Sequence, residues 1–200
     1  MTLSATQIKL WRTCPRRWAM KYRFGYEETT PAMKAGTAVH SELEAFVRDG
    51  TPPTLAAAKA ALPHLRNLVA PELERRITLP CGTTSLVGYV DLLEPTICRV
   101  TDYKTVGTFD WVLQPTQLRY DPQAVIYAAW ALAAFAWDWV DLRWLYLRRT
   151  APEASWPVED RVTQRDLVAG WASVQATAME IIALPVTDDP LDVPSNLEAC

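Results

Sequence analysis

The sequence has few cysteines, no long apolar run and no visible N-terminal signal peptide. Its four cysteines, Cys14, Cys81, Cys98 and Cys200, show no C-x-x-C spacing, so structural disulfides are not expected and the predicted compartment is reducing. The longest apolar run, residues 124–137, is shorter than the roughly 20 residues that span a bilayer. The sequence therefore predicts a cytoplasmic protein without a membrane partner.

The sequence also lacks the basic excess of a protein that binds nucleic acid by charge alone. Its formal net charge is −3, whereas such binders are usually basic. This does not exclude an enzyme with an acidic site and a local basic patch. Basic residues do cluster near the N-terminus, at Arg12, Arg16, Arg17, Lys21 and Arg23. They form either a solvated helix face or a face that contacts phosphates.

Half of the 200 residues are hydrophobic, which is enough for one globular α/β domain. The part over residues 1–75 is expected to be mainly helical, with helices near 5–11, 15–24, 36–48, 52–61 and 63–73. Residues 76–162 are expected to form the sheet core with one long helix at 122–137, and residues 163–200 a C-terminal helix and tail. Strands are expected at 76–79, 141–149 and 156–162 and in a central hairpin. The predicted fold is a central mixed sheet of four to five strands flanked by helices.

The hairpin is the segment GYVDLLEPTICRVTDYKT, residues 88–105. Two β-prone runs flank a turn that contains proline, which is typical of a hairpin. A four-residue loop after Glu94 pairs that residue with Arg99 and places Asp91 opposite Asp102. Side chains two apart on a strand point to one face, so Asp102 and Lys104 are expected on the same side, roughly 7 Å apart at their Cα atoms.

Two carboxylates held side by side repel each other and require a proton or a cation. A divalent metal with oxygen ligands meets this requirement, and a nearby lysine suits chemistry on an anion. The alternative is an ordinary edge strand with a solvated face, because Asp and Lys are common on exposed strands and short motifs often match by chance.

The wider pattern resembles the RecB-like branch of the PD-(D/E)xK nuclease superfamily, which includes the RecB and AddB nuclease domains and CRISPR-associated and phage exonucleases. Five segments match in the family's order: LSATQIKLWRTCPRRW, GTAVH, GYVDLLE, TDYKT and QAVIY. Each is weak alone, but their succession over residues 3–127 is specific. The resemblance implies a restriction-endonuclease-like core. The matched active-site positions are His40, Asp91, Asp102, Lys104, Gln123 and Tyr127.

The resemblance implies metal-dependent hydrolysis of DNA phosphodiesters. Mg²⁺ or Mn²⁺ would be held by His40, Asp91, Asp102 and the backbone carbonyl of Tyr103, and Lys104 would position or activate the attacking water. By itself, a helical histidine such as His40 is more often an ordinary core or surface residue.

Gln123 and Tyr127 are expected to contact phosphate or to orient the lysine of the signature. Without the resemblance, they would be a helix-surface residue and a core residue. For substrate binding, Arg16, Arg17 and Lys21 of the N-terminal basic cluster are the candidate DNA contacts.

The predicted activity is an exonuclease acting at DNA ends or in single strands during recombination, repair, phage or CRISPR-linked processing. The alternative is a catalytically degenerate module that binds DNA or a partner in a larger assembly. Helicase, recombinase or integrase-type proteins are the partners that either role implies.

Many relatives carry an iron–sulfur cluster on four cysteines. Cys14, in RTCPRRW, and Cys200, in SNLEAC, match two of these positions, and the two remaining C-terminal cysteines are absent. Because one chain normally supplies all four thiolates, an iron–sulfur cluster is expected only in a longer form of the chain. Cys14 and Cys200 are nevertheless expected to approach one another.

Overall fold

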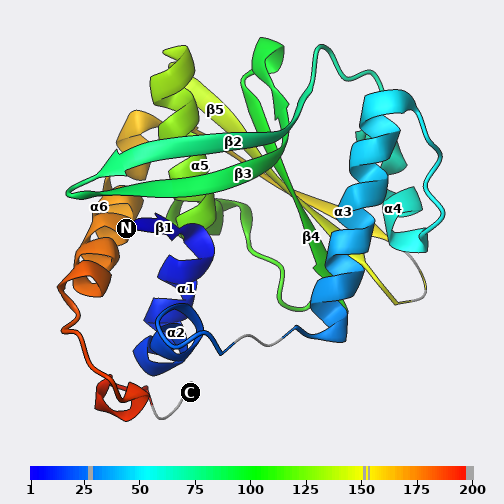
Figure 1. Cartoon of the computed structure of the whole chain (residues 1–200). Helices are drawn as coiled ribbons and strands as arrows, with labels where there is room; N and C mark the ends of the chain where they lie inside the picture. Colours follow the sequence, from blue (N-terminus) through cyan, green and yellow to red (C-terminus); the bar gives the residue numbers. More distant parts are fainter. Residues whose placement is uncertain (27–28, 151, 153, 197–200) are drawn as a thin grey trace.

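A mixed β-sheet forms the centre of the molecule (Figure 1). The computed structural model describes residues 1–26, 29–150, 152 and 154–196. Within these residues the sheet has six strands in the order β1-β3-β4-β5-β6, with β2 paired to β3 outside this path. The strands are β1 Thr2–Ser4, β2 Glu72–Cys81, β3 Thr84–Glu94, β4 Arg99–Val106, β5 Trp139–Arg148 and β6 Ser155–Thr163.

Helices cover both faces of this sheet (Figure 1). A large core joins one face to α1, α2, α5 and α6, and a smaller core joins the other face to α3 and α4. Side chains alternate between the two cores along β5, because Leu142 and Trp144 lie in the large core while Leu145 and Leu147 lie in the small one. The helices are α1 Ala5–Thr13, α2 Pro15–Tyr22, α3 Pro31–Asp49, α4 Ala56–Ala61, α5 Pro122–Phe135 and α6 Gln164–Ala183. Short 3₁₀ turns are η1 Leu62–His64, η2 Pro95–Ile97, η3 Pro115–Tyr120 and η4 Pro190–Asp192.

Helix α5 is the most buried helix, with its interior residues packed between the sheet and α6. Asp121 is its N-cap, and the carboxylate accepts hydrogen bonds from the N–H groups of Gln123 and Ala124. Lys9 of α1 holds the same carboxylate at 2.6 Å. This cap fixes the first turn of α5, which carries Gln123. No helix among the described residues has both the length and the apolarity that a membrane crossing requires.

The hairpin has the predicted register. Glu94 pairs with Arg99 and Leu92 with Thr101 across β3 and β4. The turn consists of η2 and Cys98, whose left-handed φ of 52° reverses the chain. The ladder ends at Leu92, so Asp91 and Asp102 are next in register at the point where the two strands separate.

One edge of β3 is interrupted at this point. Strand β2 runs along the opposite edge of β3, whereas β1 pairs only with residues 85–87 and β4 only with residues 92–94. Residues 88–91, here called the β3 gap, therefore lack a strand partner on that edge. Backbone groups beside a gap need other partners, and the side chain of Tyr127 supplies one by donating its hydroxyl to the carbonyl of Tyr89.

Several predicted elements differ from the structure. The helix expected over residues 63–73 does not form, and all of these residues are described by the structure. This segment contains the end of η1 and the start of β2 at Glu72. Helix α3 begins five residues earlier than expected, because Thr30 caps it and Pro31 suits its first position. The sheet exceeds the expected four to five strands by β1, which is too short to show a periodic pattern.

Candidate active site

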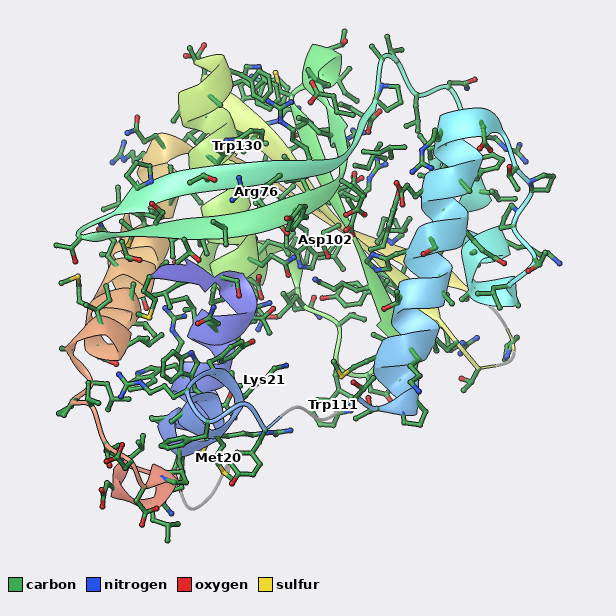
Figure 2. All side chains as sticks on the ribbon, in the orientation of Figure 1. Met20, Lys21, Arg76, Asp102, Trp111 and Trp130 are labelled. Atoms are coloured by element: carbon green, nitrogen blue, oxygen red, sulfur yellow. The ribbon has the colours of Figure 1, made fainter. Side chains whose placement is uncertain are left out.

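Two buried carboxylates flank the β3 gap. Asp91 Oδ2 accepts a hydrogen bond of 2.6 Å from the backbone N–H of Tyr103 on β4. Asp91 Oδ1 lies 3.4 Å from Nδ1 of His40, which reaches the site from α3. Asp102 lies on β4 beside the separating strands (Figure 2). The predicted positions of His40, Asp91 and Asp102 therefore converge on one place in the fold.

The Asp102 carboxylate and the Lys104 ammonium form an ion pair at 2.5 Å, as their shared strand face predicts. Gln123 bridges the two residues, because its Oε1 accepts a hydrogen bond of 2.7 Å from Lys104 and its Nε2 donates one of 2.6 Å to Asp102 Oδ1. The same Nε2 lies 2.9 Å from the hydroxyl of Tyr127. The lysine thus has one defined position, and Trp144 lies beneath its ammonium at 5.6 Å.

The pKa shifts show how strongly these charges interact. Burial raises the pKa of Asp102 to about 6, against the opposing effect of the Lys104 ammonium. Burial alone would lower the pKa of Lys104, but the Asp102 carboxylate outweighs it and raises this pKa above its usual value. The pKa of His40 behaves alike, because burial lowers it but the Asp91 carboxylate outweighs this effect and raises the pKa above its usual value. A cation beside Asp102 and His40 would favour the deprotonated form of each group.

A pocket of about 550 Å³ opens beside His40 and Asp91. Glu74 of β2 also lines it, and one ligand atom from each of these three residues lies within 4.8 Å of the others. Glu44, one helical turn beyond His40, lines the same pocket but pairs with Arg48. Three potential metal ligands thus face a pocket that is open to solvent.

Glu74 is the residue that the sequence analysis missed. It stands opposite Asp91 in the β2–β3 register, between the pairs of Leu73 with Leu92 and Arg75 with Val90. Its backbone has a left-handed φ of 48°, which is costly for a residue with a side chain and tends to occur at functional sites. Burial raises its pKa, and the nearby charge of Asp91 raises it further.

Other predicted residues lie away from this network. Arg16 donates hydrogen bonds to the carbonyls of Leu191 and Val193, so its guanidinium fastens the C-terminal segment. Cys14 is buried at the N-cap of α2 and accepts a hydrogen bond from the N–H of Arg17. Cys200 lies outside the described residues, so its approach to Cys14 stays a prediction.

Comparisons with known proteins find similarity to nucleases, which agrees with the chemistry of the site. The model of the PD-(D/E)XK nuclease superfamily matches residues 2–81, which include His40 and Glu74 but end before the hairpin aspartates. The fold is similar to the crystal structure of a protein described as a "putative exonuclease" from Eubacterium rectale, with a TM-score of 0.63, 14% identity, and coverage of 90% of this chain and 80% of that one. It is also similar to the structure of SSO0001, with a TM-score of 0.51, 15% identity, and coverage of 93% and 77%. No curated protein sequence matches the chain significantly.

The sequence comparison and the fold comparisons cover different parts of the chain. The family model matches the N-terminal segments by sequence, and the two solved structures match most of the chain by fold. The membership in the RecB-like branch rests on the five motifs alone and stays a prediction. Sequence match and fold together confirm that the chain resembles the PD-(D/E)XK nuclease superfamily, and they support a nuclease.

Proposed function

We propose that this protein is a metal-dependent deoxyribonuclease that hydrolyses phosphodiester bonds at DNA ends or in single strands. The observation that carries the proposal is the convergence of Asp91, Asp102 and Lys104 at the β3 gap, with His40 and Gln123 reaching it from opposite faces of the sheet. A structural ion pair would not require a second carboxylate, an imidazole and an open pocket at the same place.

The residues fit a divalent cation. Asp102 Oδ2 is buried, and the Lys104 ammonium lies 2.5 Å from it. Together with Asp91 and His40 it offers hard oxygen ligands and one imidazole, a donor set that suits Mg²⁺ or Mn²⁺. When bound, such an ion polarises a phosphoryl oxygen and lowers the pKa of a bound water. The backbone carbonyl of Tyr103 is a further ligand that the family resemblance suggests.

The chain's own residues position the lysine and the substrate. Lys104 stays protonated at neutral pH because its pKa is raised, so it can offset the negative charge that develops on a phosphate. Gln123 holds that ammonium through Oε1 and is itself oriented by Asp102 and Tyr127. Preorganisation of this kind is effective because no rearrangement is needed during the reaction.

The exonuclease assignment is supported by the family resemblance and by the description of the Eubacterium rectale protein. The experiment that tests it incubates the chain with end-labelled linear DNA and with circular DNA, each single- and double-stranded, in Mg²⁺, Mn²⁺ or EDTA. We expect metal-dependent loss of linear substrate, with circular molecules resistant. Cleavage of circular and linear DNA at equal rates would instead indicate an endonuclease.

The matched variants are Asp102→Asn and Asp141→Asn. The first keeps the size of the side chain and removes the proposed ligand charge, so cleavage is expected to fall about 100-fold or more. Asp141 lies on β5 and pairs with Arg161 at the surface, so Asp141→Asn should cleave like the wild type. Equal activity of all three proteins would refute the proposed site.

A further inference from the structure

A second hollow lies next to the candidate active-site pocket, on the side of the N-terminal helices. This hollow has a volume of about 470 Å³, and its lining includes Leu10, Arg17, Met20, Lys21, Tyr26 and Met33. Met33 also lines the pocket beside His40 and Asp91. The two hollows are therefore neighbours on either side of Met33, and the surface that they make up together is here called the α2–α3 groove.

We propose that the α2–α3 groove binds single-stranded DNA, with the strand running from the His40–Asp91 pocket past Met33 to the exposed face of α2. The proposal rests on the proposed function and adds the path of the substrate and the residues that select a single strand. A path next to the carboxylates is needed because the phosphate that is cleaved must be continuous with bound nucleotides.

The charges of the groove favour a phosphate backbone. Arg17 and Lys21 are four residues apart on α2, which places them on one face of the helix. Neither forms an ion pair with any of the described residues. The other N-terminal arginines have structural partners: Arg12 bonds to α6, and Arg16 and Arg23 bond to carbonyls of the C-terminal segment. Among the basic residues clustered near the N-terminus, Arg17 and Lys21 therefore remain available for phosphates, and both line the groove.

The apolar residues of the groove favour exposed bases. Tyr26 is 63% exposed, Met33 49% and Met20 37%, which is unusual for large side chains that gather at one place. Figure 2 shows Met20 and Lys21 together on α2. Basic residues that follow a backbone, combined with an aromatic ring on which bases stack, are the usual way to bind single strands without sequence preference.

The same combination disfavours a duplex. In double-stranded DNA the faces of the bases are covered by neighbouring base pairs, so Tyr26 and the two methionines would contact only the terminal pair. A single strand exposes a base face at each nucleotide and can follow the bend from the pocket to α2. The groove therefore selects single strands through base stacking, while its charges serve either form.

The test measures binding without cleavage. Fluorescence anisotropy is recorded in EDTA with a labelled oligothymidine of about 12 nucleotides, within the range of known single-strand sites, and with a duplex of the same length. Tyr26→Ala is expected to weaken single-strand binding about 5- to 150-fold, and Tyr26→Phe to restore it, because the ring is what stacks. Tyr120→Ala removes an equally exposed ring outside the groove and should bind like the wild type.

A second pair of variants tests the charges. Arg17→Ala/Lys21→Ala is expected to reduce the magnitude of the slope of log affinity against log salt by about 1.4, the value for two lost phosphate contacts on a single strand. Lys59→Ala/Arg165→Ala removes the same two charges from exposed positions on α4 and α6 and should leave the slope unchanged. Circular dichroism confirms that each variant is folded.

The outcomes separate this inference from the nuclease assignment. If Tyr26→Ala and Arg17→Ala/Lys21→Ala both bind single strands like the wild type, the α2–α3 groove is not the binding site, even if the protein cleaves DNA. Duplex binding as tight as single-strand binding, with the same loss in Tyr26→Ala, overturns it as well. If binding depends on the groove but no metal ion supports cleavage, the groove is still the binding site for single strands and the proposed nuclease function is refuted.

Discussion

Gly88 controls the position of the Tyr127 ring, and a single methyl group there should disturb both stability and the site. A Cβ at position 88 would lie 2.8 Å from Cε1 of Tyr127, closer than carbon atoms approach. The ring has little room to move, because Tyr127 is 3% exposed and its hydroxyl is bonded to the carbonyl of Tyr89. Overpacking of this kind costs about 1–3 kcal/mol of unfolding free energy.

For a chain of this size, such a loss lowers the melting temperature of Gly88→Ala by about 2 to 12 °C. Thermal unfolding in EDTA measures it without any contribution from metal or substrate. Gly107→Ala is the control, because a Cβ at Gly107 has no heavy atom within 4 Å and the change should stay within about 0.5 kcal/mol.

A double-mutant cycle then identifies the cause. Tyr127→Leu removes Cε1, so Gly88→Ala should cost much less in that background than in the wild type. The close approach of β3 and α5 would be refuted if Gly88→Ala had the melting temperature of the wild type. It would also be refuted if Gly88→Ala lost the same unfolding free energy in both backgrounds. Because Tyr127 supports Gln123, the single variant should also cleave DNA more slowly.

Three further outcomes are expected at the site. Lys104→Ala should reduce cleavage about 100-fold or more while Mn²⁺ still binds in isothermal titration, since the residue supplies charge and is not a ligand; loss of Mn²⁺ binding would contradict this role. Glu74→Gln should weaken Mn²⁺ binding about tenfold or more, whereas Glu72→Gln, which removes an exposed partner of Arg75, should not. Mn²⁺ affinity should fall as the pH decreases from about 7.5 through 6, because the raised pKa of Asp102, about 6, makes protons compete with the metal; an affinity that is independent of pH would exclude Asp102 as a ligand.

The sequence predicts the geometry of the β3–β4 hairpin well because local rules determine it. A four-residue turn determines which residues of β3 and β4 face each other, so the proximity of Asp91 and Asp102 follows from counting. The i, i+2 spacing places Lys104 beside Asp102. The helix caps at Asp121 and Thr163 follow the same kind of local rule, since in each a side chain bonds to an amide two or three residues away.

Elements that depend on distant partners are predicted less well. β2 begins before the expected residue 76. The sequence does not reveal these extra residues, because residues 74–76 are all exposed and show no alternation of apolar and polar side chains. Its pairing with β3 stabilises it, and the sequence of β2 alone does not reveal that pairing. The interruption of β3 between β1 and β4 is likewise a property of three strands together.

The position of Glu74 follows from local rules, but its backbone conformation does not. The β2–β3 turn is centred on Gly82 and Thr83, and a two-residue hairpin with glycine first is a strong local signal. Counting outward from that turn places residue 74 opposite residue 91, which is the register observed around both residues. The sequence therefore contains the proximity of Glu74 to Asp91. It does not contain the left-handed backbone of Glu74, because no local preference favours that conformation for glutamate. The surrounding sheet must maintain it, and the cation that the proposed function requires would offset its cost if it were held between Glu74, His40 and Asp91.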